Sequence, residues 1–238
     1  MYNFAILFFE FLIYSIIGFI VEVIYCSIIE KKLTFSRGYF IGPIIPIYGF
    51  GGILINIFLS QYRGEYLLLF LLGMIICGSL EYFTSWCLEK IFKLRWWDYS
   101  NEKHNLDGRI CLKNLTHFGI GAIAVVELLN PIIDKYLFRV EPKILIIGSL
   151  IFLTLILTDL IVSTQAIASL KLNILKLKNK DATTVIKKGV RRNLEERGFV
   201  TKRLVRAFPN LNDLNKYFKK NYFGDLLEKT RELILFKK

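Results

Sequence analysis

The sequence lacks the motifs by which soluble enzymes are usually recognised. It contains no Walker A phosphate-binding loop, no GxSxG nucleophile elbow, no HExxH zinc motif and no DFG sequence. Its only histidines are His104 and His117, and none of its four cysteines belongs to a CxxC pair. These absences argue against an ATPase, a hydrolase or a metalloenzyme, and we expect neither a metal nor a cofactor. We expect the cysteines to be packing thiols rather than disulfides or zinc ligands. They are Cys26, Cys77, Cys87 and Cys111.

Apolar residues, by contrast, are abundant. They make up 54% of the 238 residues, above the roughly 45–50% of an ordinary globular chain. The net charge of +12 is distributed unevenly, because residues 1–168 hold 13 basic and 13 acidic residues. Residues 169–238 hold 19 basic and 7 acidic residues. The whole excess of positive charge therefore lies in a C-terminal tail, and a soluble globular domain is not expected.

Five apolar stretches suggest membrane crossings, each of which takes about 20 residues of helix. They cover residues 3–29, 44–60, 66–91, 115–129 and 144–168. We therefore predict an all-α polytopic membrane protein with about five transmembrane helices in residues 1–168, followed by a helical basic tail in residues 169–238. The second stretch is short, opens with Pro43 and Pro46, and contains a glycine-rich run at residues 48–52. It predicts a broken or tightly packed helix or a re-entrant entry, which requires surrounding protein to cover the loosened backbone.

The basic residues between the stretches predict the orientation, because short cytosolic loops are enriched in Lys and Arg. The first and third connections are richer in these residues than the second, which contains only Arg63. With the tail on the cytosolic side, the N-terminus faces outward from the cell membrane.

The basic tail has two interpretations. The cluster at residues 187–192 is suited to anionic lipid headgroups, at roughly 1 kcal/mol per charge near the surface. Alternatively, the charges only fix the topology. No aromatic platform or groove-binding motif accompanies them, so a nucleic-acid partner is not expected.

Several acidic residues lie within the apolar stretches, where a charge costs about 2.5–3.5 kcal/mol at the centre of the membrane. Glu22 follows Gly18 by four residues and Glu81 follows Gly78 by three, so another helix can approach closely beside each carboxylate. We interpret these two as members of a buried polar network or site. Those nearer the ends of the stretches have the simpler interpretation of reaching headgroups or water. They are Glu10, Glu127 and Asp159.

The third connection contains a concentrated polar sequence. Trp97, Asp98 and Tyr99 suit a headgroup boundary, while Asn105 leads into a turn at Gly108. Arg109 then precedes an apolar stretch. It is either the counter-charge of an intramembrane glutamate or a bidentate clamp on a phosphate or carboxylate.

Four stretches taken together carry a family resemblance. They are residues 18–22 with Glu22; residues 37–49 with Arg37, Gly38, Gly42, Pro43, Pro46, Tyr48 and Gly49; residues 96–100 with Trp97 and Tyr99; and residues 105–112 with Gly108. They resemble the bacterial family called putative ABC-transporter type IV, or CmpB-like permeases, over most of the chain. The resemblance implies a small multi-pass permease component that works with a separate ATPase subunit.

Three hypotheses for function remain open. In the first, the chain is a transport component that forms homo-oligomers or joins other membrane subunits, with Glu22, Glu81 and Arg109 lining a polar cavity. In the second, it is an enzyme or binder acting on lipid headgroups at the cytosolic interface. There Arg109 would hold the phosphate, and Asp98, His104 or Glu81 would supply acid–base chemistry. In the third, the same residues form only a buried Glu–Arg network in a scaffold.

Overall fold

The computed structural model describes residues 1–31, 38–92 and 95–178, with residues 29–30 and 166–178 described by their backbone alone. Arg37 and the basic cluster at residues 187–192 lie outside the described residues, so the structure does not test the predictions made for them.

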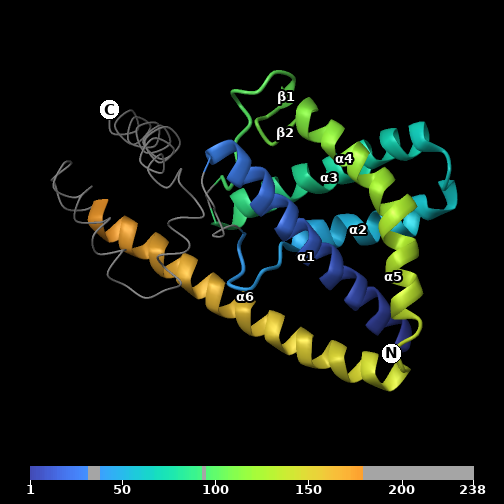
Figure 1. The fold of residues 1–238 in the computed structure, drawn as a ribbon. Helices are drawn as coiled ribbons and strands as arrows, with labels where there is room; N and C mark the ends of the chain where they lie inside the picture. Colours follow the sequence, from blue (N-terminus) through green and yellow to red (C-terminus); the bar gives the residue numbers. More distant parts are fainter. Residues whose placement is uncertain (32–37, 93–94, 179–238) are drawn as a thin grey trace, which may run out of the picture.

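The described chain is almost entirely helical (Figure 1). Four helical segments within it are long and apolar enough to cross a membrane, at residues 2–28, 66–92, 112–137 and 142–165. The protein is therefore a helical polytopic membrane protein, as the sequence predicted. In chain order its elements are α1 (Tyr2–Glu30), α2 (Pro46–Leu59), the short 3-10 helix η1 (Ser60–Tyr62), α3 (Tyr66–Phe92), β1 (Asn105–Leu106), β2 (Ile110–Cys111), α4 (Leu112–Ala124), the π-helical turn η2 (Val125–Leu129), α5 (Asn130–Leu137) and α6 (Pro142–Lys178).

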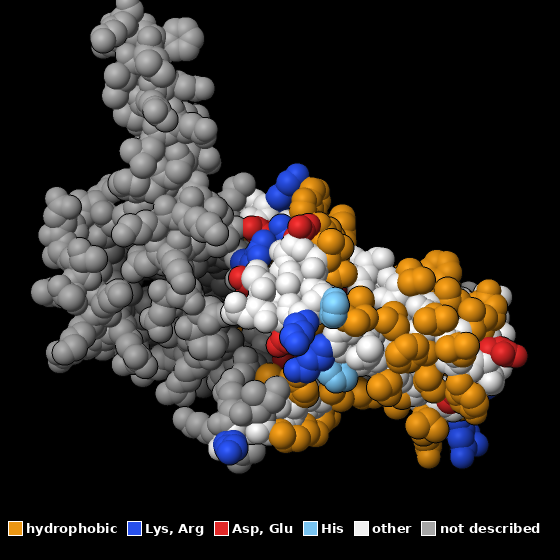
Figure 2. All heavy atoms as spheres, turned by 90° about the horizontal axis from the view of Figure 1, so that it is seen from above, with side chains coloured by type: hydrophobic (Ala, Val, Ile, Leu, Met, Phe, Trp, Pro, Cys, Tyr) orange, Lys and Arg blue, Asp and Glu red, His pale blue; other side chains and the backbone are white. Residues whose placement is uncertain are grey.

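The surface agrees with a membrane environment. Figure 2 shows a broad hydrophobic expanse on one face, with charged side chains gathered toward its two ends. Large apolar side chains remain exposed along the long helices, including Ile75 of α3 at 63% and Ile147 of α6 at 59%. Because so much apolar surface would be costly in water, we interpret these faces as being in contact with lipid.

One helical segment is longer than the sequence predicted. The fourth apolar stretch was expected to end at residue 129, but α4, η2 and α5 form one continuous segment through Leu137. Pro131 does not end it, because the proline occupies the first turn of α5, directly after the π-helical turn. The fifth stretch was expected to end at residue 168, with residues 170–178 continuing it as a basic helix. The structure extends α6 without a break through Lys178.

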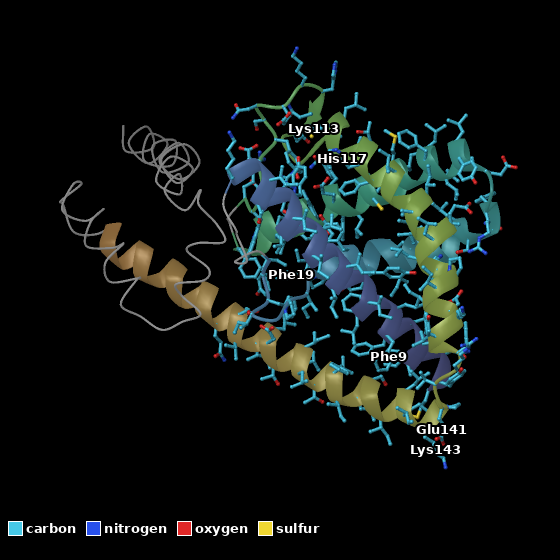
Figure 3. All side chains as sticks on the ribbon, viewed as in Figure 1. Phe9, Phe19, Lys113, His117, Glu141 and Lys143 are labelled. Atoms are coloured by element: carbon cyan, nitrogen blue, oxygen red, sulfur yellow. The ribbon has the colours of Figure 1, made fainter. Side chains whose placement is uncertain are left out.

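Helices α1 and α6 run in the same direction. Figure 3 places Phe9 of α1 between these two helices, and its ring centroid lies 6.1 Å from that of Phe152. Both helices begin at the end of the domain where Glu141 and Lys143 lie, whereas Lys113 and His117 lie at the end that carries the β1–β2 hairpin (Figure 3). We call the latter the hairpin end, and the former the opposite end.

Small residues allow the helices to pack closely. A Cβ atom added at Gly119 of α4 would lie 2.5 Å from the Phe70 ring and 2.9 Å from the Phe70 carbonyl oxygen of α3. A Cβ atom added at Gly52 of α2 would lie 2.3 Å from the Tyr14 ring of α1. Two clusters of buried apolar side chains complete the core. One contains Ala5, Ile6, Tyr14, Ile133, Leu137 and Leu145, and the other contains Ile55, Leu59, Leu69, Ala122 and Val126.

Candidate functional site

The second apolar stretch and the residues that lead into it form two unlike halves. Helix α2 has 14 residues, which at 1.5 Å per residue span about 21 Å, less than the roughly 30 Å of a hydrocarbon core. The chain leading into it, residues 38–45, forms no regular helix or strand. The backbone N–H of Ile45 donates to the carbonyl of Ser15 at 3.1 Å, which places the start of α2 beside the middle of α1.

An aspartate of α6 accepts hydrogen bonds from the backbone of the non-helical half. The backbone N–H groups of Ile41 and Gly42 donate to the two carboxylate oxygens of Asp159 at 2.8 and 2.7 Å. The hydroxyls of Tyr39 and Thr164 lie 2.5 Å apart, again joining this segment to α6. Such bonds are needed because unpaired backbone groups are costly inside a membrane. Asp159 therefore does not simply reach water or headgroups, as its position near the end of a stretch suggested.

Two carboxylates lie beside this broken crossing, on the side of the hairpin end. The Tyr48 hydroxyl of α2 donates to Glu22 of α1 at 2.9 Å. The Tyr99 hydroxyl, from the connection between α3 and β1, donates to Glu81 of α3 at 3.1 Å. The structure thus brings together four residues that the sequence had placed in separate motifs.

Glycines on α1 and α3 make room for this arrangement. A Cβ atom added at Gly18 would lie 2.2 Å from the Tyr48 ring, and one at Gly78 would lie 2.4 Å from the Leu115 side chain of α4. Each glycine therefore admits a neighbouring helix within one turn of a carboxylate.

Glu81 is the more enclosed of the two carboxylates. The residue is only 6% exposed, and its Oε2 atom has no hydrogen-bond partner among the described residues. The Asn114 side chain of α4 also faces its carboxyl group. None of the groups that act on Glu81 in the described chain is a lysine or an arginine.

The connection at residues 95–111 closes over this region as an ordered loop. The Trp97 ring nitrogen donates to the Arg109 carbonyl at 3.0 Å, and the Tyr99 N–H donates to the Gly108 carbonyl at 2.8 Å. Gly108 has a φ of 64°, which suits a residue without a side chain. The Asn105 side chain stabilises the turn by accepting from the Gly108 N–H at 3.0 Å.

The surroundings shift the pKa values of two ionisable side chains in this loop. Burial, the nearby charge of Glu81 and the bond to Glu81 hold the pKa of Tyr99 above its ordinary value. Partial burial of Asp98 acts to raise its pKa, but hydrogen bonds from Ser100 and the charge of Arg95 outweigh burial, so the pKa of Asp98 is lowered. Asp98 is therefore ionised at neutral pH and holds the loop together.

Arg109 has its counter-charge in Glu89 of α3. Its Nη2 atom lies 2.7 Å from Glu89 Oε2, and its Nη1 atom donates to the Ser85 hydroxyl at 3.3 Å. Arg95 also lies 3.5 Å from Glu89 Oε2. Sequence reasoning did not single out Glu89, although Glu81, Ser85 and Glu89 recur every four residues and so share one face of α3. That spacing was the signal that could have identified it.

A second polar network lies toward the opposite end and was also missed. Asn56 of α2 donates to Glu10 of α1 at 3.0 Å, so Glu10, only 4% exposed, is buried and does not reach headgroups. The Asn130 side chain of α5 donates to Asn56 at 2.9 Å and to Ser60 at 3.0 Å, and it accepts a bond from Tyr14. Single asparagines within apolar stretches were the available signal.

Glu127, near the end of the fourth stretch, accepts a bond from the Gly64 N–H at 2.7 Å.

The described residues were also compared with the requirements of a metal site and of a disulfide. No group of three or more His, Cys, Asp or Glu side chains there is placed to hold a metal ion. All four cysteines are free thiols, of which Cys26 and Cys111 are buried.

A comparison with protein families finds one match. A family model described as "Putative ABC-transporter type IV" matches residues 9–164, which is more than half of the chain and includes every residue of the two polar networks. No curated protein and no solved structure matches the chain.

Proposed function

Because the chain belongs to the putative ABC-transporter type IV family, we propose that it is the membrane-embedded permease component of a transporter. The observation that carries this proposal is the broken second crossing with Glu22 and Glu81 beside it. Discontinuous crossings and buried ionisable residues near mid-membrane are recurrent features of transport sites, because they supply polar groups where a continuous helix has none.

The proposed component works with other subunits. The sequence contains no ATPase motif, so ATP hydrolysis would be supplied by a separate subunit. A homo-oligomer or further membrane subunits would complete a pathway for which one copy has few crossings. In this proposal the hairpin end faces the cytosol, the N-terminus faces outward, and the basic tail contacts anionic headgroups.

The test is to purify the full-length protein from its host, identify an associated ATPase and reconstitute the two together. We expect the protein to raise the ATPase rate several-fold. The Glu22→Gln variant should lose most of this stimulation because it removes one of the two carboxylates, Glu22 and Glu81. The matched control Glu65→Gln alters an exposed carboxylate of the second connection and should retain the stimulation. Failure to associate with any ATPase, together with no ATP-dependent movement of solutes, would overturn the proposal.

One observation favours a second candidate function, the binding of anionic lipid headgroups. A shallow, open cavity of about 530 Å³ lies around the start of α4, beside the β1–β2 hairpin. Its wall gains positive charge from Lys103 and Lys113 and a ring N–H donor from His104. Such groups attract phosphate. Arg109, the clamp suggested by the sequence, is instead engaged by Glu89. The cavity is lined by Asn101, Glu102, Lys103, His104, Leu112, Lys113 and Thr116.

This second function predicts retention of lipid at one end of the molecule. Native mass spectrometry of protein purified from vesicles of mixed phosphatidylglycerol and phosphatidylcholine should show bound phosphatidylglycerol. The Lys103→Ala/Lys113→Ala variant should reduce that retention several-fold. The Lys135→Ala/Lys143→Ala variant removes two charges toward the opposite end and should not. Equal retention in both variants would contradict the assignment.

A further inference from the structure

Glu81 is buried and Glu22 is half-buried, which raises the question of what neutralises the charge of this pair. Glu22 and Glu81 come from different helices and lie close enough for the charge of Glu22 to act on Glu81. The charges of both carboxylates act on the Tyr48 hydroxyl. Two like charges in such a place repel each other and lose hydration, and both effects favour uptake of a cation or a proton.

The groups that face the pair offer hydrogen bonds but no positive charge among the described residues. They come from every element that packs around it. They are Cys26 of α1, Tyr48 of α2, Cys77 of α3, Tyr99 of the loop and Asn114 of α4, and Cys111 of β2 faces Tyr99 rather than the pair. Arg109, the nearest candidate named by the sequence, lies 2.7 Å from Glu89 instead.

We propose that Glu22 and Glu81 together bind one exchangeable proton, held chiefly on the partnerless Oε2 atom of Glu81. A proton suits the site because each carboxylate is already held by a tyrosine hydroxyl, and because no set of three metal-binding side chains is found in the described residues. In the binding step a proton from water forms an O–H bond on Glu81, and the pair changes from two negative charges to one. This inference deepens the proposed function and rests on it for any role of the proton in transport, because the proton would occupy the polar site from which that function is argued.

The proton site is linked directly to the loop at the hairpin end. Tyr99 joins Glu81 to the loop backbone, where its N–H bonds to the Gly108 carbonyl beside Arg109. An ionised carboxylate is a stronger acceptor than a carboxylic acid, so loss of the proton strengthens the Tyr99 bond and gain of the proton weakens it. The loop over the site therefore tightens or loosens with occupancy of the site.

The test is infrared difference spectroscopy of the purified full-length protein in lipid nanodiscs between about pH 5 and pH 9, the range in which buried carboxyls titrate. We expect the C=O signal of a protonated carboxylic acid to disappear as the pH rises, with release of about one proton per molecule. Glu81→Gln should abolish this signal. Glu10→Gln, which alters the buried carboxyl of the other network, and the exposed Glu65→Gln should retain it. A signal unchanged in Glu81→Gln overturns the proposal.

Two further variants keep the test decisive if Glu81→Gln does not fold. Glu22→Gln removes the neighbouring negative charge, so the remaining carboxyl should lose its proton at a lower pH than in the wild type. In a protein that keeps Trp97 as its only tryptophan, we expect the Trp97 fluorescence to change with pH as the loop tightens or loosens. Tyr99→Phe in that protein should retain the carboxyl signal but abolish the change in fluorescence. No shift in Glu22→Gln would contradict a shared proton. Because none of these measurements requires an ATPase or a transported solute, their outcome is independent of the test of the proposed function.

Discussion

Arg109 shows how single contacts attach the loop to the helices. Its guanidinium group reaches Glu89 and Ser85 on α3 with two different nitrogens, and its side chain is only 12% exposed. Its carbonyl oxygen accepts the bond from Trp97, so the backbone of the same residue also holds the loop. A lysine could supply the charge but not the two-pronged geometry.

We predict that Arg109→Ala lowers the free energy of unfolding by about 2–4 kcal/mol, because it removes the 2.7 Å ion pair with the partly buried Glu89. Arg109→Leu combined with Glu89→Leu should recover most of the loss, since it leaves neither charge of the pair uncompensated. Thermal unfolding in detergent micelles measures both effects, with the exposed Lys113→Ala as the control. If Arg109→Ala unfolds at the same temperature as the wild type, the pair does not stabilise the loop.

Among the elements, the non-helical residues 38–45 depend most on a partner from elsewhere in the chain. Their backbone N–H groups donate to Asp159 of α6 and to the Ser15 carbonyl of α1, and the bond from the Ile44 N–H to the Gly42 carbonyl lies within the segment itself. Helix α2 can start halfway along α1 only because these bonds satisfy the preceding backbone. The shape of the second crossing is therefore determined by α6.

We predict that Asp159→Ala lowers the free energy of unfolding by about 2–5 kcal/mol, because it leaves two backbone N–H groups without an acceptor. Thr158→Ala is the matched control, since the Thr158 hydroxyl bonds only to the Thr154 carbonyl of its own helix. Hydrogen exchange at Ile41 and Gly42, followed by mass spectrometry, should become faster in Asp159→Ala. Equal exchange rates in the two variants would show that the aspartate does not hold this segment.

The packing of α4 on α3 supports a second prediction for the elements. Gly119→Ala should destabilise the protein by about 1–3 kcal/mol, because the new methyl group would meet the Phe70 ring and its carbonyl oxygen. Gly121→Ala, on the same helix with no atom within 4 Å, should be neutral or stabilise the protein by up to about 1 kcal/mol. Unfolding midpoints measured in the same detergent compare the two. A midpoint for Gly119→Ala at or above that of Gly121→Ala would contradict close packing.

The sequence predicted some elements better than others, for physical reasons. The stretches that became α1 and α3 are uniformly apolar over a full membrane thickness, so composition was sufficient to place their ends within a residue or two. The end of α5 was not predictable from Pro131, because a π-helical turn makes the proline acceptable. That Glu22 and Glu81 would form hydrogen bonds within the protein was predictable from their positions in apolar stretches. Their partners were not, since the rotation of each helix depends on packing against the others.

For the whole molecule, the parallel arrangement of α1 and α6 constrains the topology. Two helices that begin at the same end are joined by an even number of reversals, so the chain between them crosses an odd number of times. Helix α3 and the continuous segment α4–η2–α5 account for two of these crossings. Residues 38–59 must supply the third, although α2 alone is too short.

This topology predicts that successive connections between the crossings lie on opposite sides of the membrane in intact cells. In a full-length variant whose four cysteines are replaced by alanine, we expect Gln61→Cys and Glu141→Cys to react with a membrane-impermeant maleimide. Lys31→Cys and Lys103→Cys should react only after the membrane is permeabilised. Gel-shift labelling measures all four under identical conditions. Reaction of Lys31→Cys and Gln61→Cys from the same side would show that residues 38–59 do not cross.

The bond between Asp159 and the second crossing also has a consequence for biogenesis. Ile41 and Gly42 leave the ribosome more than a hundred residues before the aspartate that accepts their hydrogen bonds. Until α6 has been synthesised, the amides of this segment must be satisfied by water or by the insertion machinery. The second segment to be translated is therefore among the last to settle in the bilayer, and a nascent chain that stalls before residue 159 would remain an incomplete insertion intermediate, open to quality-control proteases.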